Sequence, residues 1–330
     1  MCLGPDLPGV KPPACGPSVD RATNRPASCH CGLALIAGQR QVRDHTPDAG
    51  YDAGQQMLDQ RPPSAAGSFY PDQPAAYARG ISECFATADL GENWQPARAA
   101  ILPHAGWRYS GRVVGETLAR AQVPSRAVIL CPNHTGRGSY RAVTTAARWN
   151  LPIGSVEVDR PLAAVIRSTA SLDADDRAHA AEHAIEVLLP LLRHVRPDVS
   201  IVPICLGPLS MQDCFEIGSA LGRVLLTLTN DESRPLLIAS TDFSHYLPAE
   251  EAERLDALAI DRIRALDPQG LFEVVRTMGI SMCGVVPTTV VLKAAIDMGA
   301  VQCHLVRYTH SGAITNDRAR VVGYAGMLAE

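Results

Sequence analysis

The chain has 330 residues, of which 46% are hydrophobic and 19% are charged, a balance that suits a globular protein with a sizeable buried core. Its 30 basic and 34 acidic side chains give a net charge of −4 without a cluster of Lys and Arg, so we expect no nucleic-acid partner. No uncharged apolar run approaches the roughly 18 residues that span a bilayer, and we find no secretion signal, so we expect a cytoplasmic protein with no membrane association.

Two regions differ in composition. Residues 1–60 are rich in Pro, Gly, Ser and Cys and show neither helical nor strand periodicity, which predicts a disordered N-terminal extension. From Arg61 onward, short apolar runs alternate with longer amphipathic stretches. This alternation is typical of an α/β domain, and we expect residues 61–330 to form one such domain.

The predicted elements of this domain are short buried strands separated by amphipathic helices. A hairpin is predicted where Pro152 and Gly154 separate two short strands. In chain order we expect a helix at 75–88, a strand at 97–102, a helix at 111–121, a strand at 126–130, the hairpin at 140–149 and 155–159, a helix at 181–195, a strand at 200–206, a helix at 211–228, a strand at 235–240, helices at 249–266 and after Pro287, and a last strand at 320–328.

Polar side chains follow several of these strands at the point where each strand ends. His104 lies in PHAG, His134 lies in PNHTG, and Asp242 and His245 lie in STDFSH. Because the carboxyl ends of parallel strands meet at one edge of a sheet, these side chains can converge. A single histidine in such a place is most often structural, but the repetition favours a functional site.

The segment AEHAIEVLLPLL adds Glu182, His183 and Glu186. If it is a helix, Glu182 and Glu186 are four residues apart and project from the same side. The alternative interpretation is a solvated helix start, where the helix dipole favours acidic residues.

Cys283 and Gly284 come just before a predicted helix that Pro287 opens. A helix N-terminus stabilises a thiolate, so this cysteine is a candidate ligand or nucleophile, with a packed core thiol as the alternative.

Two imidazoles and one thiolate would make a three-ligand metal face with an open position, suited to iron, copper or zinc. Cys283 with a His and an Asp could instead be a hydrolytic nucleophile and its base. The remaining candidates would orient ligands or move protons: Asp242, His245, Glu182, His183 and Glu186.

The motifs together resemble the Memo family, whose bacterial and archaeal branch is called AmmeMemoRadiSam system protein B. The resemblance rests on AGSFYP (66–71), PHAGW (103–107), PNHTG (132–136), EHAIEVLLP (182–190), STDFSHY (240–246), MCG (282–284) and DRARVVGYAGM near the end of the chain. It implies a three-layer α/β/α fold with a central, mostly parallel or mixed sheet, related to the LigB-type class III extradiol dioxygenases, which use non-haem Fe(II).

The resemblance also implies functional residues. The family's metal ligands correspond to His104, His134 and Cys283, with Asp242 and His245 in the same pocket. The chain differs from animal Memo in having Thr135 where a second histidine follows the ligand. It differs from the dioxygenases in having Cys283 where their third ligand is a carboxylate, and a thiolate ligand changes the electronic properties of iron.

Three functions follow as hypotheses. The first is a redox-active metal protein that binds iron or copper, with zinc as a further candidate, and acts on a small molecule or dioxygen as a dioxygenase-like enzyme. The second is a non-catalytic metal-holding or partner-binding protein that works with a radical SAM protein and the AmmeMemoRadiSam A component, as the family name implies. The third is a hydrolase that depends on Cys283.

Overall fold

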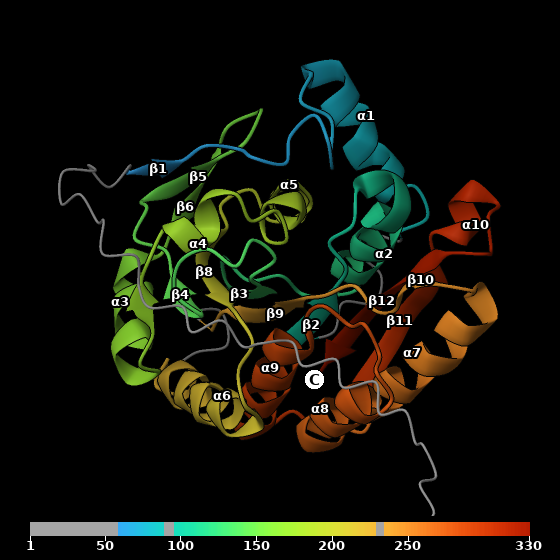
Figure 1. Ribbon diagram of the computed structural model, residues 1–330. Coiled ribbons are helices and arrows are strands. Elements are labelled where there is room, and N and C mark those ends of the chain that lie inside the picture. Colours follow the sequence, from blue (N-terminus) through green and yellow to red (C-terminus); the bar gives the residue numbers. More distant parts are fainter. Residues whose placement is uncertain (1–58, 89–95, 229–233) are drawn as a thin grey trace, which may run out of the picture. The chain divides into compact units, whose positions relative to one another are not determined.

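The structure of the protein is a computed structural model that describes residues 59–88, 96–228 and 234–330. Residues 1–58 of the predicted disordered extension lie outside the described residues. Residues 55–330 form one compact unit. Within the described part of this unit, a mixed β-sheet lies between two layers of helices, as Figure 1 shows.

The described strands form one sheet, whose main path runs in the order β1-β5-β6-β8-β3-β9-β2-β12-β10. Beside this path, β11 pairs with β12, and β4 pairs with both β7 and β8. The strands are β1 (Gln60–Arg61), β2 (Ala99–Leu102), β3 (Arg126–Pro132), β4 (Arg141–Val143), β5 (Arg148–Asn150), β6 (Ser155–Val158), β7 (Asp173–Ala174), β8 (Ser200–Leu206), β9 (Leu236–Ser240), β10 (His245–Leu247), β11 (Cys303–His310) and β12 (Val321–Ala329).

The centre of the sheet is parallel. Strands β6, β8, β3, β9 and β2 pair in parallel with one another in that order, whereas β12 pairs antiparallel with β2, β10 and β11. Parallel neighbours point their carboxyl ends toward the same edge, so the residues that follow β2, β3 and β9 meet there. This edge is where the sequence places the candidate histidines.

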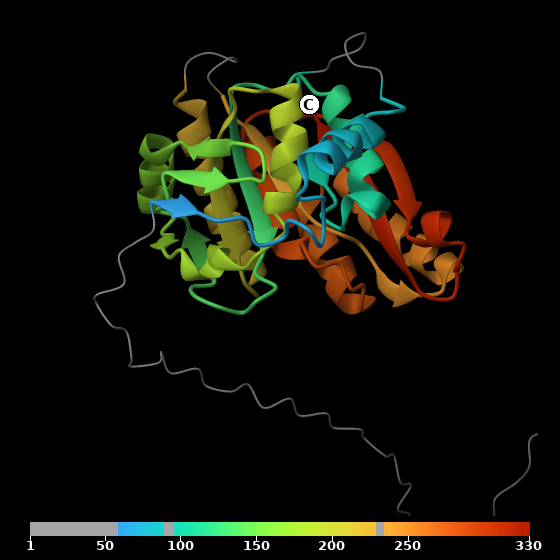
Figure 2. The same cartoon turned by 90° about the horizontal axis from the view of Figure 1, so that it is seen from above.

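Helices cover both faces of the sheet (Figures 1 and 2). One face carries α3 (Arg160–Thr169), α6 (Met211–Leu226), α7 (Ala249–Arg264), α8 (Pro268–Thr277) and α9 (Val285–Asp297), and the other carries α1 (Pro74–Cys84), α2 (Trp107–Ala119) and α5 (Leu189–Val195). Three shorter helices are α4 (Arg177–Ala180), η1 (Glu186–Leu188) and α10 (Gly312–Thr315). Among the described residues, no helix combines the length and the apolar character needed to cross a bilayer.

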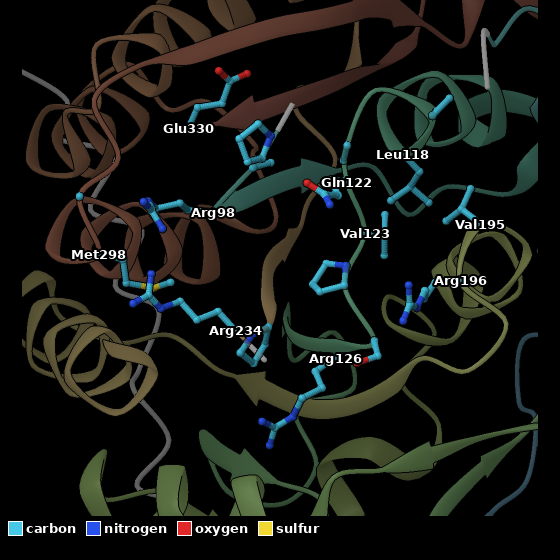
Figure 3. Close-up of a pocket in the computed structure, with 18 of the residues that line it drawn as sticks. Arg98, Leu118, Gln122, Val123, Arg126, Val195, Arg196, Arg234, Met298 and Glu330 are labelled. Atoms are coloured by element: carbon cyan, nitrogen blue, oxygen red, sulfur yellow. The ribbon is translucent and has the colours of Figure 1, made fainter. Parts of the chain in front are cut away.

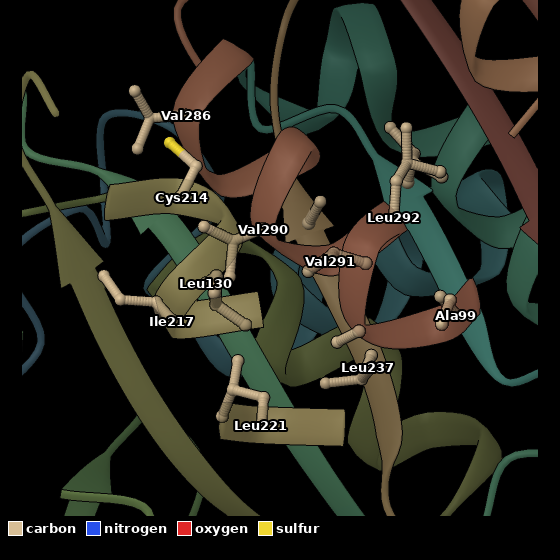
Figure 4. Close-up of a cluster of buried hydrophobic side chains, with 14 of the residues drawn as sticks. Ala99, Leu130, Cys214, Ile217, Leu221, Leu237, Val286, Val290, Val291 and Leu292 are labelled. Carbon is tan, nitrogen blue, oxygen red and sulfur yellow. The ribbon is translucent and has the colours of Figure 1, made fainter. Parts of the chain in front are cut away.

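The strands are buried on both sides, which explains their continuous apolar sequences. In β3, Val128 and Leu130 belong to the core on the α6 and α9 side, whereas Ile129 belongs to the core on the other side. Figure 4 shows Leu130 among Ile217 and Leu221 of α6 and the valines of α9. Successive side chains of a strand point to opposite faces, so one strand fills both cores.

The expected fold class is confirmed, and the predicted strands at 97–102, 126–130, 200–206, 235–240 and 320–328 correspond to β2, β3, β8, β9 and β12. The predicted hairpin is confirmed only next to its turn, where β5 and β6 pair antiparallel; the start of the predicted 140–149 strand is the separate strand β4, which pairs with β7 and β8. The sequence analysis did not predict α3, α8 or β11.

The predicted helix at 181–195 is wrong in its first half. Residues 181–185 are not helical, and the regular helix α5 begins at Leu189 with Pro190 in its first turn. A helix that began at 181 would place Pro190 in its interior, where the ring clashes with the carbonyl of Glu186 and one hydrogen bond is lost. In the first turn of α5 the same proline costs nothing, because its missing N–H would have no partner there.

Candidate metal centre

Three segments that are far apart in the sequence meet at the carboxyl edge of the parallel strands. His104 follows β2, His134 follows β3, and Cys283 precedes α9. Their potential ligand atoms all lie within 4.8 Å of one another, and Cys283 Sγ is 3.3 Å from His104 Nε2. The structure therefore brings together the two imidazoles and the thiol that the sequence analysis selected.

Close packing of the start of α9 places the thiol. A Cβ atom on Gly284 would lie 2.4 Å from the Cβ of Thr241 and 2.6 Å from the carbonyl oxygen of Ser240. Real Cβ atoms do not approach other atoms so closely, so only glycine lets this helix start against the end of β9. The backbone N–H of Gly284 also donates to Thr241 Oγ1 at 3.0 Å.

His104 is held as a neutral ring with a defined tautomer. Its Nδ1 lies 2.8 Å from Ser240 Oγ, and the Ser240 hydroxyl donates its own proton to the carbonyl of Ala184 at 2.6 Å. Nδ1 must therefore be the donor to Ser240, which leaves the lone pair of Nε2 facing Cys283. Burial, helped by nearby histidines, lowers the pKa of His104 well below its usual value and keeps the ring neutral.

His134 is oriented by a buried carboxylate. Its backbone N–H donates to Glu182 Oε2 at 2.7 Å, and its Nδ1 lies 2.9 Å from Glu182 Oε1. A carboxylate accepts, so Nδ1 carries the proton and Nε2 is free to bind a metal. The imidazole is 32% exposed, so the site opens to solvent at this ligand. Burial opposes ionisation of Glu182, but the hydrogen bonds from His134 and from the backbone of Ala184 hold its pKa below the usual value.

The acidity of the Cys283 thiol differs from the expectation. Burial, followed by the charge of Asp242, raises the pKa of the thiol, so the predicted stabilisation of a thiolate by the helix N-terminus is not found in the metal-free protein. Its Sγ accepts a hydrogen bond from the backbone N–H of Asp242 at 3.3 Å. A bound metal cation would displace the proton of this thiol, because coordinating thiols are deprotonated.

Asp242 and His245 lie beside these ligands in different ways. Asp242 is 4% exposed and accepts a hydrogen bond from the backbone N–H of His104 at 2.8 Å. Burial raises its pKa to about 7, although the backbone hydrogen bonds act in the opposite direction. His245 points its Nδ1 to the carbonyl of Ser281 at 2.9 Å, so this nitrogen is the donor. Neither residue belongs to the group of three that can share one ion.

His183 and Glu186 lie in different surroundings. His183 stacks on His134 with ring centroids 4.8 Å apart, and Phe69 stacks on His183 at 4.2 Å. Glu186 instead forms a buried ion pair with Arg61 at 2.7 Å and accepts a hydrogen bond from Tyr70. The two glutamates do not share a helix face, because residues 181–185 are not helical, and Glu186 lies outside the metal centre. Both are fully buried, so the alternative of a solvated helix start is also wrong.

Several residues that build the site were not assigned roles from the sequence. Ser240 fixes the tautomer of His104, Phe69 covers His183, and Arg61 with Glu186 anchors the segment that carries Phe69. The motifs AGSFYP and STDFSHY contain Phe69 and Ser240, but nothing in their spacing indicates which partners they meet.

A cavity of about 1040 Å³ lies at the other end of the strands and contains none of the predicted site residues (Figure 3). It is lined at the amino ends of β2 and β3, where Arg98 and Arg126 lie, and by Val195 and Arg196 at the end of α5. Arg196 lies at the C-terminus of α5, where an arginine interacts favourably with the helix dipole.

Comparison with known proteins gives consistent similarities. A family profile described as Memo-like protein matches residues 61–328. A MEMO1 family protein of Methanothermobacter thermautotrophicus is 38% identical over 276 residues, which cover 80% of this chain and 98% of that protein. A MEMO1 family protein of Methanopyrus kandleri is 40% identical over 281 residues (82% and 98%), and one of Aquifex aeolicus is 35% identical over 269 residues (81% and 98%).

Proposed function

Because the chain belongs to the Memo-like protein family, we propose that it is a redox-active metal protein that binds one iron or copper ion through His104, His134 and Cys283. The observation that carries this proposal is the orientation of the two rings. Each Nδ1 is occupied by a hydrogen-bond acceptor, so each Nε2 is free for a metal. Metal-binding histidines are usually held in this way.

The donor set fits such an ion. Two neutral imidazoles and one thiol suit iron, copper and zinc, and disfavour magnesium and calcium, which prefer oxygen. Three protein ligands leave a coordination position for a small molecule or dioxygen. Bound iron or copper would supply one-electron chemistry at that position, whereas zinc would supply Lewis acidity without redox chemistry.

The surrounding residues have separate tasks in this proposal. Ser240 and Glu182 hold the rings of His104 and His134 in the ligating tautomer. The exposed side of His134 provides access from solvent. Burial raises the pKa of the Asp242 carboxyl to about 7, so this group beside the ligands can take up or release a proton near neutral pH.

The proposal is tested by metal analysis of protein purified without oxygen. We expect about one metal ion per chain in the wild type and a loss of most of it in Cys283→Ala, because the thiolate is one of only three ligands. Cys303→Ala is the matched control, since Cys303 is a buried cysteine on β11 outside the site. Full occupancy in Cys283→Ala would remove the thiol from the ligand set.

Redox activity needs a second measurement on the same protein. We expect the electron paramagnetic resonance signal of the bound ion to appear on oxidation and to disappear on reduction by ascorbate. A bound ion that does not respond, such as zinc, would contradict the redox part of the proposal and leave the metal site intact.

A further inference from the structure

A second group of donors adjoins the first. His134, Glu182 and His183 offer ligand atoms that also lie within 4.8 Å of one another. Glu182 Oε1 is 2.9 Å from His134 Nδ1 and 3.4 Å from His183 Nδ1. Neighbouring ligands of one ion with bonds of about 2.0–2.2 Å are about 2.8–3.6 Å apart, so these contacts have the spacing of two ligand pairs.

We propose that the site has two metal positions that share His134. The thiolate position consists of His104, His134 and Cys283, and the carboxylate position consists of His134, Glu182 and His183. The inference rests on the proposed function, because His134 belongs to both positions. It adds a second ligand set of a different chemical class.

The carboxylate of the second position is fixed before any ion binds. Glu182 is fully buried, and its Oε2 is anchored by the backbone N–H of His134 at 2.7 Å. Its Oε1 also accepts the backbone N–H of Ala184 at 3.1 Å and faces both imidazoles. His183 is held between the rings of Phe69 and His134. A fixed carboxylate lowers the entropy cost of binding an ion, while the stacked rings of His134 and His183 would turn so that both direct a nitrogen at it.

The two positions exclude each other because they need opposite tautomers of His134. The thiolate position takes Nε2 of His134, with the proton on Nδ1 donated to Glu182. The carboxylate position takes Nδ1, so the proton moves to Nε2 and the hydrogen bond to Glu182 is replaced by two metal bonds. One ion is therefore bound at a time.

The softness of the ion decides which position it takes. A set with a thiolate favours Cu(I), whereas a set with a carboxylate and no thiolate suits a harder ion such as Mn(II). A harder ion would lie nearer the exposed ring of His134 and a softer ion nearer the buried ring of His104. The same site would thus hold different metals through different residues.

Anaerobic competition titrations with Cu(I) and with Mn(II) test this inference. His104→Gln removes a ligand of the thiolate position only, and His183→Phe removes a ligand of the carboxylate position only while keeping a ring between Phe69 and His134. We expect His104→Gln to weaken Cu(I) binding at least about tenfold and to leave Mn(II) binding within about twofold. His183→Phe should do the reverse, and His134→Gln should weaken both ions.

The outcomes separate the two proposals. If His183→Phe leaves the affinities for both ions unchanged, the carboxylate position is absent, and Glu182 with His183 only orients His134. If Cys283→Ser leaves Cu(I) binding unchanged, the thiolate position fails, and with it the proposed function. Circular dichroism of each variant confirms that the fold is retained, and His183→Leu repeats the test without the ring.

Discussion

At the scale of single residues, Ser240 shows how a small side chain determines the chemistry of a larger one. Its hydroxyl oxygen accepts a hydrogen bond from Nδ1 of His104, and its O–H donates a hydrogen bond to the carbonyl of Ala184. The ring can therefore present only Nε2 to a metal. We predict that Ser240→Ala lowers the affinity for Cu(I) by about 10- to 100-fold, because the ring loses its fixed orientation. Anaerobic competition titration measures this change.

The control for this prediction is Ser244→Ala. Ser244 is as buried as Ser240 and lies in the loop after the same strand, but among the described residues it makes no hydrogen bond to the three ligands. An equal loss of affinity in both variants would show that the effect comes from general loosening of this loop rather than from the tautomer of His104.

At the scale of elements, the docking of α9 against the end of β9 sets the distance between the thiol and the imidazoles. Because a Cβ on Gly284 would overlap Thr241 and the Ser240 carbonyl, we predict that Gly284→Ala displaces the helix start. Overpacking of this kind costs about 1–3 kcal/mol of unfolding free energy, and metal occupancy should fall with it. Urea unfolding and metal analysis measure the two effects.

Val285→Ala tests whether any change at this helix start has the same result. Val285 is only partly buried, and its truncation leaves space instead of causing a clash. Retained metal occupancy in Val285→Ala together with loss in Gly284→Ala is the expected pattern. Full occupancy in Gly284→Ala would mean that the loop before α9 adapts and that close packing does not position Cys283.

At the scale of the whole molecule, buried neutral histidines link folding to pH. Burial lowers the pKa of His179 from 6.5 to about 4, so the unfolded chain binds a proton that the folded protein does not bind between these values. Stability therefore rises with pH in this range and is lost as pH falls from 6.5 toward 4. At about 1.4 kcal/mol per unit, His179 alone would cost the acidified protein about 3 kcal/mol.

This prediction is measured by urea unfolding of the wild type and of His179→Leu at several pH values between 4 and 6.5. The variant should lose less stability on acidification than the wild type, because leucine binds no proton. Equal slopes would show that His179 is not responsible for the acid sensitivity. His179 lies outside the metal centre, so the test is independent of metal binding.

Much of the fold was predictable because local rules act on neighbouring residues. Buried strands gave continuous apolar runs, as in 200–206, and the turn at Pro152 and Gly154 marked the β5–β6 hairpin. The prediction of a helix over 181–195 was wrong because it followed the apolar spacing and neglected the effect of Pro190 on the preceding residues. Short amphipathic helices such as α3 and α8 were missed.

The sequence by itself determined the α/β class, the strand-end positions of His104, His134 and Asp242, and the selection of Cys283, because strand and turn patterns are local and the family motifs are specific. Only the tertiary structure decided that Ser240 and Glu182 fix the two rings, that burial raises the pKa of Cys283, and that Glu186 pairs with Arg61 outside the metal centre. Hydrogen-bond partners and burial depend on which segments meet across the sheet, and such contacts are set by packing between residues that are distant in the sequence.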